Sequence, residues 1–217
     1  MEYFIKDLKK MHILLFGFAI MALGIILTKR ADLGMAPWGV FHQGLSNILN
    51  MKLGTVIQIV GFIILVFSVI FLKTKVGIGT ILNVLLVGTF INIFDEIIYF
   101  EPSSLLEKLI ILLIGLVFIT FGRSVYISAV LGPGPRDGVF VGVTRLTGLS
   151  VKYVKPSIEM TVLVIGFLLG GPIGVGTIIL VGCSGFLVHY FFGVLKFDPK
   201  SKKQSDIFRY FNKKARI

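Results

Sequence analysis

Two stretches of the chain decide its fold: ADLGMAPWG at residues 31–39 and AVLGPGPRDG at residues 129–138. They correspond when the chain is slid along itself by 98 positions, from 31 to 129. The same offset superposes further glycines and prolines, namely Gly17 on Gly115, Gly24 on Gly122, Gly34 on Gly132, Pro37 on Pro135 and Gly44 on Gly142. At an offset of 97 (77 to 174), residues 77–81 and 174–178 share the pattern Gly-x-Gly-Thr-Ile. The chain therefore contains two duplicated units, residues 11–100 and 109–195.

Composition places both units in a membrane. Of the 217 residues, 55% are hydrophobic and 15% charged, with a mean hydropathy of +0.93, which excludes a soluble globular protein. The single cysteine, Cys183, excludes an intrachain disulfide and a cysteine-rich zinc site. The net charge of +11 does not indicate nucleic acid, because half of the 22 basic residues lie in the two tails. This distribution indicates cytoplasmic tails under the positive-inside rule.

Uncharged runs predict about six transmembrane helices. Three lie at residues 11–28, 53–72 and 76–94, a fourth starts at residue 109, and a turn at residues 170–174 splits the run 160–195 into two more. An even number of spans agrees with two cytoplasmic tails. The loop charges follow this orientation, with Lys73, Lys75, Arg136, Arg145, Lys152 and Lys155 inside, Glu101 and Glu107 outside, and Lys29 and Arg30 as the exceptions.

We expect one transmembrane domain over residues 1–195, followed by a basic cytoplasmic tail at 196–217. The predicted fold class is an all-α polytopic membrane protein with two inverted three-helix repeats and Gly/Pro-broken short helices. Inversion follows because an odd number of spans per unit makes successive units enter the membrane from opposite faces. Were the short helices also to span, each unit would have four spans and the repeats would be parallel. The polar stripe of residues 39–50 argues mildly against that alternative, since it should face a cavity or the protein interior.

The broken segments predict a substrate-binding site. Pro37 and Pro135 should start short helices, whose N-terminal N–H groups favour anions, and Arg136 adds a donor suited to carboxylate or phosphate. The candidate residues for solute contact or for shaping the backbone are Trp38, His42, Gln43, Arg136, Asp137, Gly34, Pro37, Gly132, Gly134 and Pro135. In the competing interpretation the Gly/Pro turns only allow helices to pack, and Arg136 and Asp137 neutralise each other at the cytoplasmic interface.

Two further charges interrupt the predicted spans. Arg123 lies about one turn from the cytoplasmic end of the fourth span, which favours a side chain that reaches the lipid headgroups over a functional role. Glu159, near the start of the fifth span, is expected to pair with Arg123 or with a nearby lysine, or to lie at the interface. Asp95 and Glu96 are expected to be solvated at the outer end of the third span.

The two broken stretches, together with FHQGLS at residues 41–46 and GIGTILN at residues 77–83, resemble the YczE/YyaS/YitT family of bacterial integral membrane proteins, closest to its YczE branch. The resemblance covers residues 15 to 195, and GPRDG at residues 134–138 is its most specific element. The chain has Gly39 where that branch often has an acidic residue after Pro-Trp, so any role of that carboxylate is absent. The resemblance implies the bacterial cytoplasmic membrane.

These observations favour a carrier or permease for a small anionic or zwitterionic solute. The alternative is a non-transporting membrane accessory, or a solute-binding subunit that works with a partner protein. The expected partners are the lipid bilayer, a small-molecule solute and, in the alternative, a protein. No Walker loop, His-Glu-x-x-His motif or Cys/His cluster occurs, so we expect neither catalytic residues nor a cofactor or metal, and the chain is not expected to be an enzyme.

Overall fold

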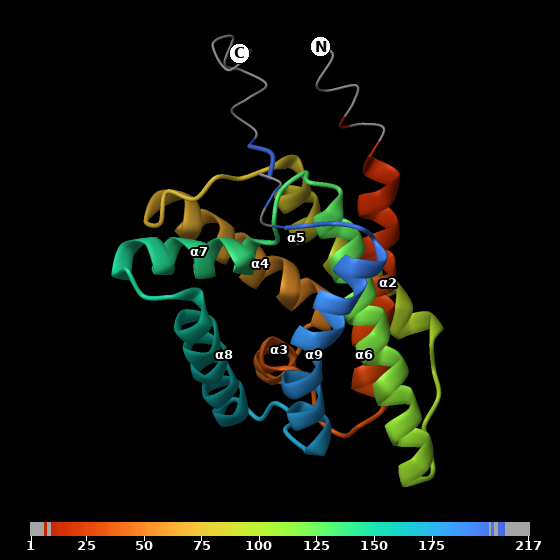
Figure 1. Cartoon of the computed structure of the whole chain (residues 1–217). Helices are drawn as coiled ribbons and strands as arrows, with labels where there is room; N and C mark the ends of the chain where they lie inside the picture. Colours follow the sequence, from red (N-terminus) through yellow and green to blue (C-terminus); the bar gives the residue numbers. More distant parts are fainter. Residues whose placement is uncertain (1–6, 8–9, 200, 202–203, 207–217) are drawn as a thin grey trace, which may run out of the picture.

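The computed structural model describes residues 7, 10–199, 201 and 204–206, and over these residues it contains helices and no strand (Figure 1). The described helices are α2 (Met11–Arg30), α3 (Pro37–Leu49), α4 (Leu53–Ile70), α5 (Ile78–Ile97), α6 (Leu105–Ser128), α7 (Pro135–Thr147), α8 (Val151–Leu168) and α9 (Val175–Val194). The all-α polytopic fold predicted from the sequence is thus confirmed. Most of the expected basic tail at 196–217 lies outside the described residues.

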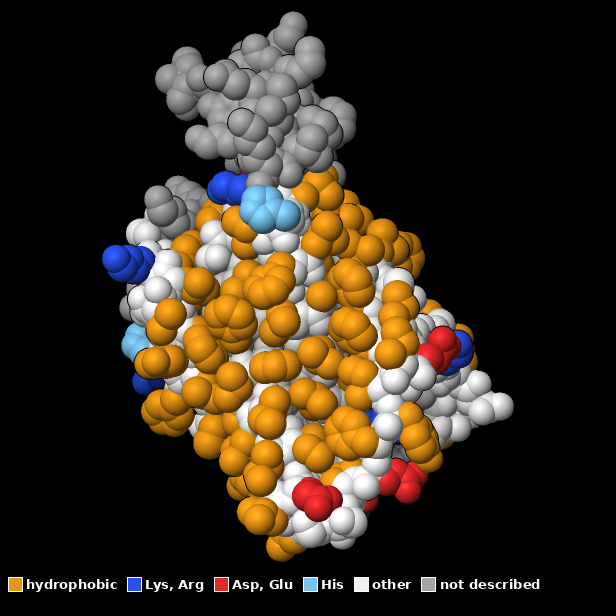
Figure 2. Space-filling model, turned by 90° about the vertical axis from the view of Figure 1, so that its right-hand side faces the viewer, with side chains coloured by type: hydrophobic (Ala, Val, Ile, Leu, Met, Phe, Trp, Pro, Cys, Tyr) orange, Lys and Arg blue, Asp and Glu red, His pale blue; other side chains and the backbone are white. Residues whose placement is uncertain are grey.

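Five helices have the length and composition of membrane spans: α2, α4, α5, α6 and α9. The fifth expected span differs, because α8 begins at Val151 and its first half carries Lys152, Lys155 and Glu159. The start of α6 also precedes its predicted position. Ser104 and Glu107 form a capping box there, with the Glu107 amide donating to the Ser104 hydroxyl. Apolar side chains cover the middle of the face in Figure 2, as expected for a surface in contact with lipid.

The centre of the fold is the pair α2 and α6, which pack closely along their lengths and run antiparallel (Figure 1). Glycines bring the two backbones together. A Cβ at Gly17 would lie 2.9 Å from the Gly122 carbonyl oxygen, and one at Gly24 would lie 2.6 Å from the Gly115 carbonyl oxygen. These four glycines are the ones that the repeat superposes. Their duplication is therefore explained by close helix packing of the kind that small residues permit in membranes.

The two broken segments make reciprocal contacts with the opposite unit. The Leu33 carbonyl accepts from the Gly176 amide at 2.7 Å, and the Leu131 carbonyl accepts from the Gly79 amide at 2.8 Å. The turns that follow require glycine, because Gly34 has φ +96° and Gly132 has φ +124°. The Gly-x-Gly-Thr-Ile pattern that the two units share therefore marks the place where the broken segment of the opposite unit docks. Each unit supplies this place for the other.

The short helices are exchanged in the same way. The first unit's α3 packs on α8, and the second unit's α7 packs on α4. A Cβ at Gly44 of α3 would lie 2.8 Å from the Gly166 carbonyl oxygen, while one at Gly142 of α7 would lie 2.7 Å from the Leu72 side chain. In Figure 1, α7 lies across the upright helices and α3 is seen end-on in the interior. Both short helices therefore lie between the two units.

Described residues from both ends of the chain contact the C-terminal end of α6. The Lys10 ammonium donates to the Ala129 carbonyl at 3.3 Å, and the Gln204 amide donates to the Ile127 carbonyl at 3.2 Å. Gln204 also accepts from the Gly132 amide at 3.1 Å. The segment 204–206 therefore covers the docking point of the second broken segment, a contact that sequence periodicity did not predict.

The two exceptions to the loop-charge pattern are ion-paired. Lys29 donates to Asp95 at 2.6 Å, and Arg30 donates to the other oxygen of the same carboxylate at 2.9 Å. The sequence analysis expected Asp95 to be solvated, whereas the structure shows it paired with two cations. Lys52 donates to Glu96, and this hydrogen bond raises the pKa of the lysine. The C-terminal ends of α2 and α5 are thus held by an ionic cluster.

Candidate functional site

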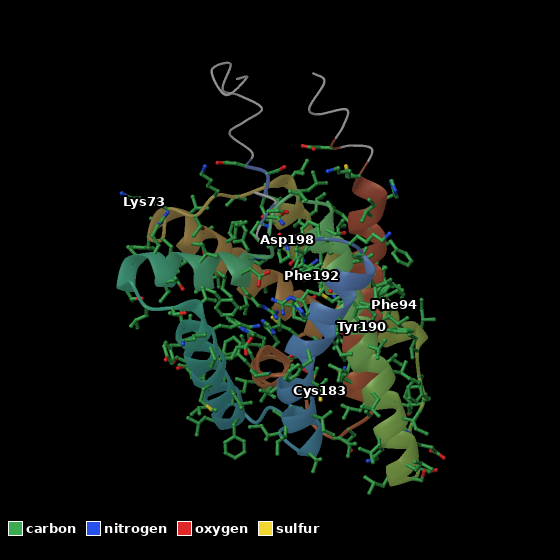
Figure 3. All side chains as sticks on the ribbon, viewed as in Figure 1. Lys73, Phe94, Cys183, Tyr190, Phe192 and Asp198 are labelled. Carbon is green, nitrogen blue, oxygen red and sulfur yellow. The ribbon has the colours of Figure 1, made fainter. Side chains whose placement is uncertain are left out.

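A cavity of about 190 Å³ lies between the two units, and all eight described helices contribute to its lining. Figure 3 shows nitrogen-bearing side chains gathered in the interior between α3, α7 and α9. Polar residues on this lining come from the short helices α3 and α7 and from α5, α6, α8 and α9, whereas apolar residues supply most of the remaining wall. A small, partly polar cavity in the middle of a helical bundle is the usual place for a ligand site.

Both short helices direct their first turns to this cavity. Ala36 and Pro37 line it at the start of α3, and Gly134 and Pro135 line it at the start of α7. Neither N-terminus is capped by a side chain. Because the first N–H groups of a helix have no partner within the helix, two partial positive charges meet at one site. The prolines behave as predicted, since each occupies the first helical position.

The two neighbouring residues Arg136 and Asp137 do not neutralise each other. Asp137 accepts from Arg123 at 2.7 Å and from the Tyr126 hydroxyl at 3.4 Å. Arg123 therefore turns into the protein, and the expectation that it reaches the headgroups is wrong. Arg136 lies over the Trp38 ring, with its guanidinium carbon 4.8 Å from the ring centroid. Among the described residues, no carboxylate lies within ion-pair distance of Arg136, and Asp137 and Glu159 act on its charge only from farther away.

A stack of three side chains crosses the boundary between the units. Trp38 contacts both Arg136 of α7 and His42, which lies one helical turn along α3 with its ring centroid 6.0 Å from that of the indole. His42 is 1% exposed, and its Nε2 atom has no hydrogen-bond partner; the same holds for the Trp38 Nε1 atom. Buried polar atoms are usually hydrogen-bonded in folded proteins. Unpartnered atoms on the cavity wall therefore indicate a position for a polar ligand.

The rest of the lining combines one loose ion pair with apolar side chains. Lys155 and Glu159 are 3.9 Å apart on successive turns of α8. Glu159 thus pairs with a nearby lysine, which is one of the two pairings that the sequence left open. Apolar residues from five helices form the remaining wall, including Ile25, Ile57, Val84, Leu116, Ile119 and Leu180. In the part of the chain that the structure describes, no group of three His, Cys, Asp or Glu side chains could hold a metal ion.

The structure brings most of the predicted site residues together. Trp38, His42, Pro37, Gly134, Pro135, Arg136 and Asp137 all line the cavity. Three of the predicted residues do not. Gln43 does not line the cavity, and its side-chain amide donates to Asn47 at 2.8 Å. Gly34 and Gly132 form the turns in which the broken segments contact the opposite unit. Sequence reasoning omitted Tyr126, expected Arg123 to reach the headgroups and counted Lys155 among the cytoplasmic loop charges, although charged residues inside a span are a functional signal.

The chain matches the model of the family of unknown function DUF6198 over residues 8–193. It belongs to this family. It is 35% identical to an uncharacterised protein of Haemophilus influenzae over 188 residues, covering 86% of this chain and 85% of that one. It is also 35% identical to the uncharacterised membrane protein YczE of Bacillus subtilis over 175 residues, covering 80% and 81% of the two chains.

A third relative is the uncharacterised protein YyaS of Bacillus subtilis, 28% identical over 192 residues, with 87% of this chain and 94% of that one covered. The resemblance to YczE and YyaS inferred from the broken segments is thereby confirmed, and YczE's description as a membrane protein agrees with the five candidate spans. No solved structure matches this chain.

Proposed function

We propose that this protein is a membrane carrier that binds a small anionic or zwitterionic solute in the cavity between its two units. The observation that carries the proposal is the position of Arg136, stacked on Trp38 with no carboxylate of the described residues within ion-pair distance, at the meeting point of two uncapped helix N-termini. A guanidinium in an interior of low dielectric is costly unless an anion accompanies it. A solute that brings a negative charge would remove this cost.

The arrangement of the units supports a carrier mechanism. The antiparallel packing of α2 on α6 and the reciprocal docking of Leu33 and Leu131 suit two inverted repeats with a site between them. In transporters built this way, broken helices form the site, and one repeat rocks against the other to expose it to each face in turn. We assign the same role to α3 and α7, whose first turns would move with opposite units.

We place the protein in the bacterial cytoplasmic membrane with both termini in the cytoplasm. The loop charges support this orientation, because Lys73 and Lys75 lie between α4 and α5, and Lys75 lies 4.0 Å from Asp206 of the C-terminal segment. The proposal assigns the chain no enzymatic reaction. Energy for uphill movement would come from an ion gradient or from a separate protein.

Uptake into liposomes that contain this chain alone tests the proposal. Labelled benzenesulfonate, alanine and phosphate represent a monoanion, a zwitterion and a multiply charged anion. The sulfonate stays ionised and so does not cross lipid as a neutral acid. We expect saturable uptake of at least one probe, abolished by Arg136→Gln and retained by Lys75→Gln, which removes one charge from an exposed side chain. Saturable binding without uptake would overturn the carrier assignment and indicate the accessory or solute-binding subunit instead.

A further inference from the structure

The charged groups on the cavity wall balance to a single positive charge. Arg123, Arg136 and Lys155 are cationic, whereas Asp137 and Glu159 are anionic. Each carboxylate already has a cation: Asp137 lies 2.7 Å from Arg123, and Glu159 lies 3.9 Å from Lys155. Among the described residues, the guanidinium of Arg136 is the one cationic group on the wall that has no carboxylate within ion-pair distance. A solute with one negative charge would neutralise the site.

The same net charge of the cavity wall disfavours zwitterionic, doubly negative and neutral solutes. The ammonium of a zwitterion would need a carboxylate, and both carboxylates on the wall are paired. A dianion would place its second charge close to Asp137 or Glu159, where Coulomb repulsion is stronger than in water because the dielectric constant is low. A neutral polar solute would leave the charge of the half-buried Arg136 without a direct partner.

The shape of the cavity adds a second constraint. Its volume of about 190 Å³ is slightly larger than a cavity of about 150 Å³ that accepts benzene in another protein. Apolar side chains of α2, α4, α5 and α6 line it together with the charged groups. The body of the solute would contact these side chains while its anionic group meets Arg136 and the two helix N-termini.

We infer that the solute is a small monoanion with an apolar body, a carboxylate or sulfonate about the size of benzoate, and neither a zwitterion nor a dianion. This inference rests on the proposed carrier function and specifies the substrate class of the same site. Carboxylates and sulfonates of this kind share one delocalised anionic group and one apolar group on opposite sides of a molecule small enough to fit the cavity.

The protein carries its own reporter for this test. Trp38 is the single tryptophan of the chain, and it lies on the cavity wall against Arg136. Its fluorescence therefore reports ligand binding at this site, without a label and without signals from other tryptophans. Titrations use the full chain purified in detergent, with benzoate, benzenesulfonate and benzamide as probes that share one ring but differ in charge. Isobutyrate, alanine and methylmalonate form a second set, which differs by one substituent.

We expect saturable changes of Trp38 emission with benzoate and benzenesulfonate, and dissociation constants higher by about tenfold or more for benzamide. Isobutyrate should bind more tightly than alanine or methylmalonate. Arg136→Gln should raise the dissociation constant of benzoate by about tenfold, and Lys75→Gln should leave it unchanged. Arg136→Lys keeps the charge but lacks the planar stack on Trp38, so it should bind with intermediate affinity and serves if Arg136→Gln does not fold. Equilibrium dialysis of labelled benzoate checks each variant independently of the tryptophan signal.

Tighter binding of alanine or methylmalonate than of isobutyrate would overturn the inference, as would the absence of any response to benzoate and benzenesulfonate. Because these titrations measure binding alone, their failure is separable from failure of the proposed function. If the protein binds benzenesulfonate but does not move it across the membrane, the inferred site stands and the carrier assignment is wrong. If the protein moves alanine through an Arg136-dependent site, the carrier assignment stands and the inference that the solute is a monoanion is wrong.

Discussion

Arg123 of α6 pairs with Asp137 of α7 at 2.7 Å, and this contact joins the central helix of the second unit to its own short helix. It also takes the one carboxylate adjacent in sequence to Arg136. The pairing therefore has two consequences: it fixes the first turn of α7 against α6, and it leaves the Arg136 guanidinium available to the cavity.

We predict that Arg123→Gln destabilises the protein, because it leaves the Asp137 carboxylate without a cation in a poorly solvated position. The expected loss in free energy of unfolding is about 1–3 kcal/mol, less than for a fully buried pair because both side chains retain some exposure. Unfolding in mixed micelles measures it. The double variant Arg123→Gln/Asp137→Asn should be more stable than the sum of the two single losses predicts, with a coupling of about 1–3 kcal/mol. Simple additivity would show that the pair carries no net interaction.

Close packing of α2 on α6 predicts a strong effect of a single methyl group. A Cβ at Gly24 would lie 2.6 Å from both the Gly115 carbonyl oxygen and the Ile119 amide nitrogen, neither of which can move without shifting a helix. Gly24→Ala should therefore lower the free energy of unfolding by about 1–3 kcal/mol. Gly182→Ala on α9 is the matched control, since nothing lies within 4 Å of its Cβ. An equal loss in the two variants would contradict the α2–α6 packing.

The ionic cluster at the C-terminal ends of α2 and α5 predicts different effects for two adjacent acids. Asp95 holds Lys29 and Arg30 with a side chain that is 24% exposed, whereas Glu96 is 63% exposed and pairs with Lys52. Asp95→Asn should cost about 1.5–3 kcal/mol, because charge-assisted hydrogen bonds to two cations are weakened. Glu96→Gln should cost about 0–1 kcal/mol, as surface ion pairs do. Thermal unfolding in one detergent compares them directly, and a larger loss in Glu96→Gln would refute the assignment.

Inverted repeats predict the sidedness of two corresponding loops. Lys73 lies between α4 and α5, and Ile173 lies between α8 and α9. These two connections lie at opposite ends of the molecule in Figure 1. Single cysteines at these positions, in a Cys183→Ser background, should react with an impermeant reagent from opposite faces of the membrane, Lys73→Cys from the cytoplasm. Reaction of both from one face would indicate parallel units and remove the basis for alternating exposure.

Local sequence signals predicted much of the architecture. Pro37 and Pro135 start α3 and α7 as expected, because proline favours the first helical position whatever its surroundings. The repeat located the broken segments, since glycines at positive φ or at close backbone contacts tolerate few replacements. The membrane spans followed from the lengths of uncharged runs, except where α8 extends through charged residues that line the cavity.

Contacts between distant residues were not predictable in the same way. No periodicity indicates that Arg123 pairs with Asp137, or that one carboxylate, Asp95, neutralises both Lys29 and Arg30. The sequence pattern also assigned Gln43 to the polar stripe without showing that it turns toward Asn47. Each of these partners lies within one unit, and each contact depends on how the helices of that unit pack or on which rotamer a side chain adopts, neither of which a sequence pattern specifies.

Trans-stimulated uptake of benzenesulfonate is the measurement that tests the central claim most directly. Liposomes containing this chain alone are loaded with unlabelled benzenesulfonate, and entry of labelled probe is compared with that into empty liposomes. If one cavity at Trp38 and Arg136 is exposed to the two faces in turn, internal probe should accelerate entry, and Arg136→Gln should abolish this acceleration while Lys75→Gln preserves it. Saturable binding at Trp38 with no acceleration, or acceleration that persists in a folded Arg136→Gln protein, would contradict the account.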